Sequence, residues 1–287
     1  MTARRQQDIL YGYKDGMALV MDVYYPAREP NRAAVLQLIS GAYRSDLATW
    51  REDFTEASDI SGLLHAGFTV FAVGHSSSPR YRVDEILPDI SRAVRFVRHH
   101  SDDFGIDPLR IGMKGISSGG LLTLVAAASP PLADPAAELP VDRESSAVQA
   151  VVVYSSPTDL LNVIKPGTDF LQFFRMSGQP VLPAFDFHTW DELTQRFERV
   201  IDGAPYLEVA RQISPMTHLD SGAPPVLLLH SDSDPIVPLQ QAESLAARLQ
   251  ELGVPGKLVT AQGRGHVWDL TGEEVKEVVA WFSRYLL

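Results

Sequence analysis

Short apolar runs rich in β-branched residues alternate with longer amphipathic segments along most of this chain. Strands are predicted over residues 18–25, 33–39, 68–74, 110–115, 150–155, 225–230 and 256–261. Several of these runs are apolar on both faces, which is typical of the central strands of a parallel sheet covered by helices. Strands that alternate with helices at this spacing predict an α/β fold with a mostly parallel, doubly wound sheet.

The segment 83–99 has a clear helical pattern. Its apolar side chains recur at steps of three and four residues, and Arg92, Arg95 and Arg98 occupy the other side. Similar patterns predict further helices over 119–128, 239–252 and 273–287. Near the N-terminus, a Lys-Asp-Gly turn at 14–16 joins the first two strands, which predicts an antiparallel hairpin at one edge of the sheet.

Residues 157–223 interrupt the alternation, because they are rich in proline, glycine and aromatic side chains and show no clear strand. One interpretation is a helical excursion packed on the sheet. We favour a small cap inserted between two core strands, over the carboxyl ends of the strands, where ligands bind in sheets of this type. The chain 1–287 is then a single domain with a cap insertion.

The stretch Gly115-Ile116-Ser117-Ser118-Gly119 matches the pattern G-x-S-x-G, in which the serine stands at a sharp strand-to-helix turn. The flanking positions must be small because the neighbouring chain passes close to the turn. A predicted strand precedes the stretch and a predicted helix follows it, as the motif requires. Ser117 is therefore the predicted nucleophile, because Ser118 has Ile116 where the first glycine should stand. The helix dipole also favours negative charge at this position.

A serine nucleophile needs a base and a carboxylate that orients the base. On this fold they follow the serine in the order acid, then histidine. Asp232 and Asp234 both follow the strand at 225–230, and we favour Asp234, which precedes Pro-Ile-Val-Pro and the next helix. Asp232 is expected to cap or brace the loop. Among the eight histidines, His266 has the required order, a glycine-rich approach and a position after the last strand.

An acyl-transfer site also needs hydrogen-bond donors for the oxyanion that forms on the substrate. One predicted donor is the backbone N–H of Ser118. The loop 40–46, after the strand at 33–39, is expected to supply the other from Gly41 and Ala42. Whether Gly41 or Tyr43 donates beside Ala42 depends on a register of one residue. The substrate pocket is predicted to include Tyr43, His75, Phe170 and Phe174.

Composition excludes several classes of protein. The net charge of −11 and the absence of a basic stripe argue against nucleic acid as a partner. The chain has no cysteine, which removes disulfides and thiolate chemistry, and no metal or other cofactor is predicted. No apolar run approaches the ~20 residues of a membrane span. The N-terminal stretch has no apolar signal-peptide core, so we expect a cytoplasmic protein or a secreted one whose leader has been removed. A homodimer is compatible with the sequence, although nothing in it supports one.

Together these features resemble the α/β-hydrolase superfamily over nearly the whole chain, and the resemblance implies that the mostly parallel, doubly wound sheet is eight-stranded. More narrowly, the sequence resembles serine esterases related to hormone-sensitive lipase and to feruloyl and acetylxylan esterases. The residues that carry the resemblance are GISSGG, the stretches 92–115 and 214–238, and GRGH. The resemblance implies hydrolysis of small-molecule carboxylic esters through an acyl-enzyme, and it places the triad at Ser117, Asp234 and His266.

One loop departs from the pattern of that family. Those esterases usually have His-Gly-Gly-Gly followed by an aromatic residue, whereas this chain reads Ile39-Ser40-Gly41-Ala42-Tyr43. The aromatic residue is retained, but side chains now stand on the acyl side of the oxyanion hole. This disfavours bulky acyl groups and esters of tertiary alcohols. The predicted substrate is a small or medium ester, such as an acetyl or feruloyl ester of a plant sugar.

Three alternatives use the same fold. An aryl-formamide hydrolase has the same triad and an equally short chain. A small serine peptidase of the prolyl oligopeptidase type usually carries a propeller, for which 287 residues are expected to leave no room. An inactive, hydrolase-like binding protein would show a damaged triad, whereas all three members are present here.

Overall fold

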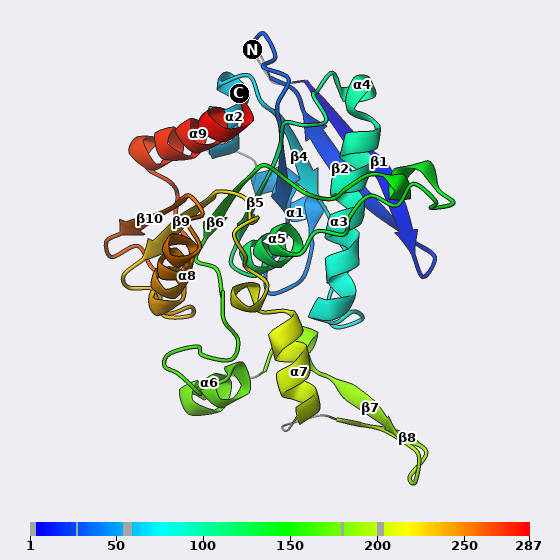
Figure 1. Cartoon of the computed structure of the whole chain (residues 1–287), viewed down its shortest axis with the longest axis vertical. Coiled ribbons are helices and arrows are strands. Elements are labelled where there is room, and N and C mark those ends of the chain that lie inside the picture. Colours follow the sequence, from blue (N-terminus) through cyan, green and yellow to red (C-terminus); the bar gives the residue numbers. More distant parts are fainter. Residues whose placement is uncertain (1–3, 27, 54–58, 179–180, 200–203) are drawn as a thin grey trace.

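The computed structural model of the chain describes residues 4–26, 28–53, 59–178, 181–199 and 204–287. Figure 1 shows two parts of unequal size: a sheet between two layers of helices, and a smaller lobe at one end, coloured green to yellow. The lobe belongs to the middle of the chain, because the sheet continues on both sides of it in sequence.

The sheet confirms the predicted class. Its members are β1 (Arg5–Lys14), β2 (Met17–Tyr24), β3 (Ala34–Leu38), β4 (Thr69–Val73), β5 (Ile111–Ile116), β6 (Ala150–Tyr154), β9 (Val226–Ser231) and β10 (Gly256–Ala261). They form one eight-stranded sheet in the order β1-β2-β4-β3-β5-β6-β9-β10. The predicted hairpin, β1 with β2, lies at one edge, and β2 is antiparallel to β4. All other neighbours are parallel.

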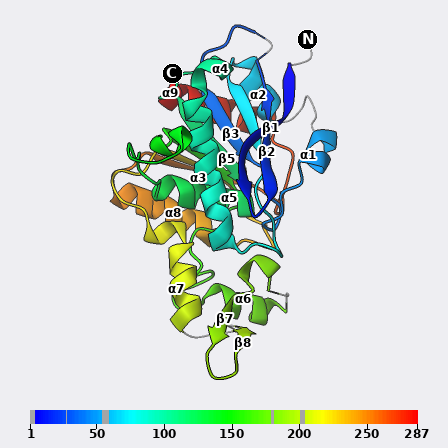
Figure 2. The same cartoon turned by 90° about the vertical axis from the view of Figure 1, so that its right-hand side faces the viewer.

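Helices cover both faces of the sheet, as Figures 1 and 2 show, which confirms the doubly wound arrangement. One face packs against α3 (Val83–His99), α5 (Ser118–Ala128) and α8 (Gln240–Glu251). The other packs against α2 (Asp59–His65) and α9 (Gly272–Leu286). The connections add α1 (Leu47–Asp53), α4 (Ser101–Phe104) and a 3₁₀ turn at Pro140–Arg143. No helix in the described ranges combines the length and the apolar character that a membrane span requires.

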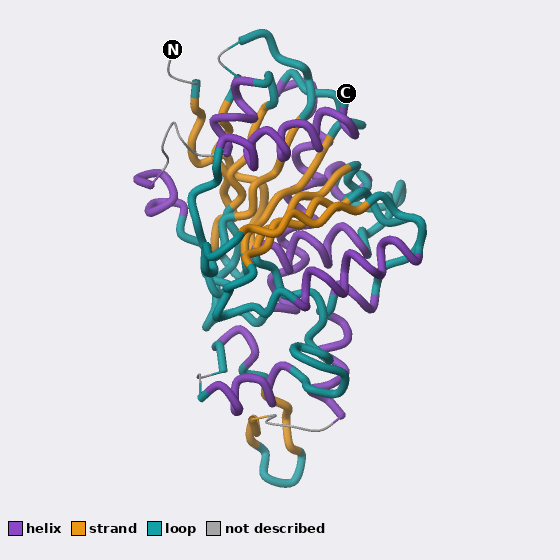
Figure 3. Tube along the Cα trace, turned by 90° about the vertical axis from the view of Figure 1, so that its left-hand side faces the viewer, coloured by secondary structure: helices purple, strands orange, loops and turns teal. Residues whose placement is uncertain are grey.

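The lobe lies between β6 and β9 and falls within the predicted insertion at 157–223. It contains α6 (Phe170–Ser177), β7 (His188–Asp191), β8 (Arg196–Arg199), α7 (Ala204–Gln212) and two 3₁₀ turns at Pro183–Phe185 and Pro215–Thr217. In Figure 3 it stands apart from the sheet at one end of the molecule. Buried aromatic side chains attach it to the larger part, since Phe170, Phe185 and Tyr206 belong to the main core.

The expectation that this region lacks strands was wrong. β7 and β8 form a two-stranded antiparallel sheet, with His188 opposite Arg199 and Asp191 opposite Arg196. Each strand has four residues, and β8 is exposed along its length, so no apolar alternation marks it in the sequence. An edge-to-face aromatic pair, Trp190 and Phe197 with ring centroids 5.2 Å apart, joins the two strands instead.

Candidate active site

Ser117 occupies a sharp turn between β5 and α5. Its backbone has φ 53° and ψ −119°, a conformation that L-residues rarely adopt. A Cβ on Gly115 would lie 2.3 Å from the carbonyl oxygen of Gly119, and one on Gly119 would lie 3.3 Å from the carbonyl oxygen of Leu38. A side chain at Gly115 is therefore excluded by the backbone of Gly119, whereas one at Gly119 would fit only tightly. The turn presents the Ser117 side chain at the carboxyl end of a central strand.

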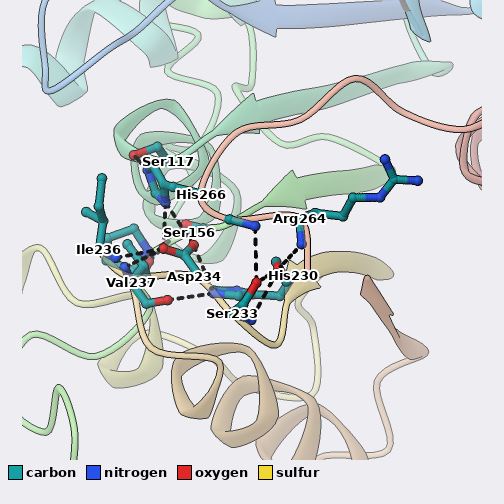
Figure 4. A network of polar contacts seen from close by, with 12 residues as sticks. Ser117, Ser156, His230, Ser233, Asp234, Ile236, Val237, Arg264 and His266 are labelled. Atoms are coloured by element: carbon teal, nitrogen blue, oxygen red, sulfur yellow. Dashed lines mark hydrogen bonds and ion pairs between the residues drawn. The ribbon is translucent and has the colours of Figure 1, made fainter. Parts of the chain in front are cut away.

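His266 and Asp234 meet Ser117 in the continuous chain of hydrogen bonds shown in Figure 4. His266 Nε2 lies 2.8 Å from Ser117 Oγ. On the other side of the ring, His266 Nδ1 lies 2.8 Å from Oδ2 and 3.0 Å from Oδ1 of Asp234. The three residues follow β5, β9 and β10, so the sheet brings together positions far apart in sequence. An acceptor at Nδ1 fixes the tautomer whose Nε2 lone pair faces the serine hydroxyl.

The Asp234 carboxylate is fully buried and well supplied with donors. It accepts hydrogen bonds from the amides of Ile236 and Val237, both at 2.9 Å. His230 Nε2 lies 3.4 Å from Asp234 Oδ2 and donates to the Val237 carbonyl at 2.8 Å. Burial alone would raise the pKa of Asp234, but the hydrogen bonds from His230, His266 and the two amides lower it below its usual range. The carboxylate is therefore charged at neutral pH and held in one orientation.

The other acid candidate, Asp232, has a different task. Its Oδ1 accepts the Gly263 amide at 2.8 Å, which ties the loop after β9 to the loop after β10. Two hydroxyls reinforce this link: Ser231 Oγ accepts from the Arg264 amide at 3.1 Å, and Ser233 Oγ from the Gly265 amide at 3.3 Å. Asp232 thus braces the His266 loop, as the sequence indicated.

The loop after β3 forms a tight turn in which Gly41 and Arg44 exchange backbone hydrogen bonds of 2.9 and 3.0 Å. This corrects the expectation for Gly41, because its N–H already donates to the Arg44 carbonyl. The Tyr43 N–H donates to Ser118 Oγ at 3.1 Å. Of these three amides, Ala42 is the one for which the described chain provides no acceptor. Ser118 opens α5, so its own amide has no intrahelical partner either.

The four predicted pocket residues lie in two places. Tyr43 is buried with its ring edge-on to Phe185, at a centroid distance of 5.1 Å. Phe170 lies 4.5 Å from Phe185 and 4.4 Å from Phe174, so three of the four belong to one aromatic cluster. His75 is buried elsewhere, with Nδ1 donating to the Ser76 carbonyl at 2.6 Å.

None of the four lines the cavity that adjoins the Ser117 turn. This cavity, of about 700 Å³, borders Ile116, next to Ser117, and Ser40 and Gly41 of the β3 loop. The remaining wall combines apolar side chains, Leu38, Ile39 and Trp50, with polar ones, and more of its surface is apolar than polar; the polar residues are Gln37, Arg44, Ser45, Asp46, Thr49, Ser77 and Ser78. The sequence offered no signal for this wall, because its residues come from the separate stretches 37–50 and 77–78 and from position 116.

Burial of His75 makes the protein less stable in mild acid. Burial lowers the pKa of this imidazole, against the opposing effects of the Ser76 hydrogen bond and the Asp89 charge; Lys14 adds to the lowering. Below about pH 6.5 the unfolded chain therefore takes up a proton that the folded chain resists, and stability falls as pH decreases. We expect the urea midpoint to drop less between pH 7.5 and 5.5 in His75→Asn than in wild type.

The His75 experiment has a matched control. Asparagine places an amide where His75 Nδ1 stands, so the bond to Ser76 is retained. His188→Asn changes an exposed histidine of the lobe hairpin and should leave the wild-type pH dependence unchanged. Equal pH dependence in wild type and His75→Asn would contradict the prediction.

Comparison with known proteins identifies the family. A family model described as BD-FAE matches residues 21–249, most of the chain. The chain belongs to the BD-FAE family. The matched part of this BD-FAE chain includes Ser117 and Asp234 and ends before His266.

One similar relative of this BD-FAE protein is Esterase LipQ of Mycobacterium tuberculosis, 28% identical over 255 residues that cover 88% of the chain and 54% of LipQ. The chain spans about half the length of the curated relatives it matches.

Two solved structures share the BD-FAE chain's α/β-hydrolase fold. A truncated carbohydrate esterase from gut microbiota has a TM-score of 0.77 at 22% identity, covering 99% of this chain and 96% of its own. An acetyl ester-xyloside bifunctional hydrolase from Caldicellulosiruptor lactoaceticus has a TM-score of 0.73 at 20% identity, covering 99% and 97%.

Several contacts of the BD-FAE site were not foreseen from the sequence. One is the contact between His230 and the Asp234 carboxylate. The others are the hydrogen bond from the Gly265 amide to the Ser233 hydroxyl, which joins the β9 and β10 loops, and the bond from the Tyr43 amide to the Ser118 hydroxyl. Within the described parts of the chain, no three His, Asp or Glu side chains are grouped so that they could hold a metal ion.

Proposed function

We propose that this chain is a carboxylic-ester hydrolase with Ser117 as nucleophile, His266 as general base and acid, and Asp234 as the group that orients His266. The observation that carries the proposal is the unbroken contact from Ser117 Oγ through His266 to Asp234, at 2.8 Å on each side of the ring. Esterase names among its relatives, LipQ included, support the same activity.

Each residue of the triad has a defined step. Ser117 Oγ attacks the ester carbonyl while its proton passes to His266 Nε2. Asp234, buried and charged, stabilises the imidazolium that forms. His266 then gives the proton to the leaving alcohol, and an acyl group remains on Ser117. Water, deprotonated by the same nitrogen, attacks this acyl group and releases the acid.

The tetrahedral intermediates carry negative charge on the former carbonyl oxygen, which the amides of Ser118 and Ala42 are positioned to stabilise. Support comes from the hydrogen bonds around them, since the Gly41 and Tyr43 amides have other acceptors. Removal of one such donor typically costs 10²–10³ in kcat.

We assign the lobe within 157–223 the role of a cap over the site. The contact of Phe185 with Tyr43, which follows Ala42 in the β3 loop, supports this role. Phe170 and Phe174 extend the aromatic surface from that contact into α6. Closure by these side chains would exclude water from the acyl-enzyme until the alcohol leaves.

The wall of the 700 Å³ cavity offers polar side chains that can pair with the hydroxyls of a sugar alcohol, and apolar ones, among them Trp50, that can pack against the C–H face of its ring. Hydroxyl and amide groups of this kind pair with sugar hydroxyls, whereas a long alkyl chain would leave them without partners. A carbohydrate esterase and an acetyl ester-xyloside hydrolase among the structural neighbours agree with this chemistry. We therefore propose esters of a carbohydrate with a small or medium acyl group, acetyl or feruloyl.

The test is a comparison of p-nitrophenyl acetate, butyrate and octanoate with acetylated xylo-oligosaccharides and methyl ferulate. Expected are hydrolysis of the short aryl esters, little activity on octanoate, and a higher kcat/KM for the acetylated xylo-oligosaccharides or methyl ferulate than for p-nitrophenyl octanoate. If none of these esters is hydrolysed while an aryl formamide is, the ester assignment is wrong.

A further inference from the structure

The β3 loop adopts a backbone conformation that its residues do not favour. Ala42 and Tyr43 have φ values of 48° and 63°, in the left-handed region that glycine enters without strain. Two adjacent residues with side chains remain there only when surrounding contacts hold them. The contacts of this loop therefore decide where the Ala42 amide points.

The Ser118 hydroxyl is the central contact. Its Oγ is buried and accepts the Tyr43 N–H at 3.1 Å. The same oxygen lies 3.1 Å from Ser40 Oγ and 3.3 Å from the Ser40 carbonyl oxygen. A hydroxyl has one proton to donate and two lone pairs, so it can serve Tyr43 as acceptor and Ser40 as donor together. One side chain thus connects both ends of the turn that contains Ala42.

We propose that the Ser118 side chain is a positioning residue, which fixes the Ala42 amide relative to the Ser118 amide and so sets the geometry of the oxyanion hole. This inference rests on the proposed function. Ala42 and Tyr43 are adjacent, so a shift of the Tyr43 peptide moves the Ala42 donor. The hydroxyl that holds the loop and the Ser118 amide belong to the same residue. The bond from Tyr43 to this hydroxyl therefore holds the Ala42 amide at a fixed distance from the Ser118 amide.

Other contacts keep the loop folded without Ser118. The Ser78 amide donates to the Tyr43 carbonyl at 3.0 Å, and the Ser45 amide donates to Ser77 Oγ at 2.8 Å. The Tyr43 ring also packs against Phe185. Loss of the Ser118 hydroxyl should therefore misplace the Ala42 amide without unfolding the loop. We expect it to weaken stabilisation of the transition state, and so to lower kcat, more than it weakens substrate binding.

The test compares wild type with Ser118→Ala, Ser118→Thr and Thr123→Val on p-nitrophenyl acetate. Ser118→Ala is expected to lower kcat roughly 10- to 100-fold, less than complete loss of a donor, with KM nearly unchanged. Ser118→Thr keeps the hydroxyl and should recover most of this loss. Thr123→Val removes a buried hydroxyl of the same helix, whose hydrogen bond among the described residues is to the Gly119 carbonyl within α5, and controls for packing.

A second readout separates positioning from a structural role. A trifluoromethyl ketone adds to the serine and places its oxyanion in the hole, so its inhibition constant should rise in Ser118→Ala by the same factor as kcat/KM falls. Urea midpoints should stay close to that of wild type. The proposal is overturned if wild type and Ser118→Ala have equal kcat/KM and equal inhibition constants. It is also overturned if Thr123→Val loses as much kcat as Ser118→Ala does. An inactive wild type would instead overturn the proposed function itself.

Discussion

Ser117→Ala is expected to lower kcat for p-nitrophenyl acetate by roughly 10⁴- to 10⁶-fold. The residue supplies the oxygen to which the acyl group is transferred, 2.8 Å from His266 Nε2, and no other hydroxyl in the described chain contacts that nitrogen. A small rate above that of water should persist, because binding and the oxyanion donors remain.

The adjacent residue provides the comparison for this variant. Ser118→Ala removes a hydroxyl one position away and should remain at least about a hundred times more active than Ser117→Ala. Covalent labelling adds an independent measurement: an organophosphate should increase the mass of wild type and Ser118→Ala but not of Ser117→Ala. Activity or labelling retained in Ser117→Ala would show that another residue is the nucleophile.

Asp234→Asn is expected to lower kcat about 10⁴-fold with little change in KM. The asparagine amide would occupy the position of an acceptor, so His266 would lose the partner that holds Nδ1 protonated. The negative charge that stabilises the imidazolium would also be gone. Measurement of kcat and KM at pH 7–8 on the same aryl ester tests this expectation.

Asp232→Asn is the matched control, because the two aspartates share one loop. Its side-chain oxygen can still accept the Gly263 amide, so activity should stay within a few-fold of wild type. A loss in Asp232→Asn as large as that in Asp234→Asn would mean that loop bracing, not the charge next to His266, explains both results.

Asp234 is also expected to make the free energy of unfolding depend on pH. Because hydrogen bonds hold its folded-state pKa below the unfolded value of about 3.9, its charged form stabilises the folded chain above that value. This contribution is lost as pH falls through the lower, folded-state pKa. The stability difference between wild type and Asp234→Asn should therefore shrink as the medium becomes acidic.

Elements with a strong local pattern could be predicted closely from the sequence. The helix at 83–99 has the predicted ends, because its apolar stripe, acidic first turn and basic last turn agree. The contact between Ser117, His266 and Asp234 could also be expected, since each residue follows a parallel strand and the carboxyl ends of those strands lie at one edge of the sheet. Close packing at Gly115 and Gly119 explains why the nucleophile motif is so recognisable.

Features set by tertiary contacts could not be predicted. The donor register in the β3 loop depends on the φ values of Ala42 and Tyr43, which the Ser118 hydroxyl and the Ser78 amide impose from elsewhere in the chain. The lobe hairpin has an exposed strand without apolar alternation, and its turn residues lack an Asn-Gly or Asp-Gly pair. His75 follows a strand much as His266 does, but only the structure shows that it is buried and that its Nδ1 donates to the Ser76 carbonyl.

The edge position of β10 leads us to expect that heat or denaturant inactivates the protein before it unfolds it. This strand pairs only with β9 and stands at the margin of the sheet, yet the loop that follows it carries His266. Local opening at that margin would break one ladder and remove the base from Ser117, while the central strands stay paired. Inactivation by heat or denaturant should therefore precede global unfolding, and activity should return during refolding only after this last strand has docked.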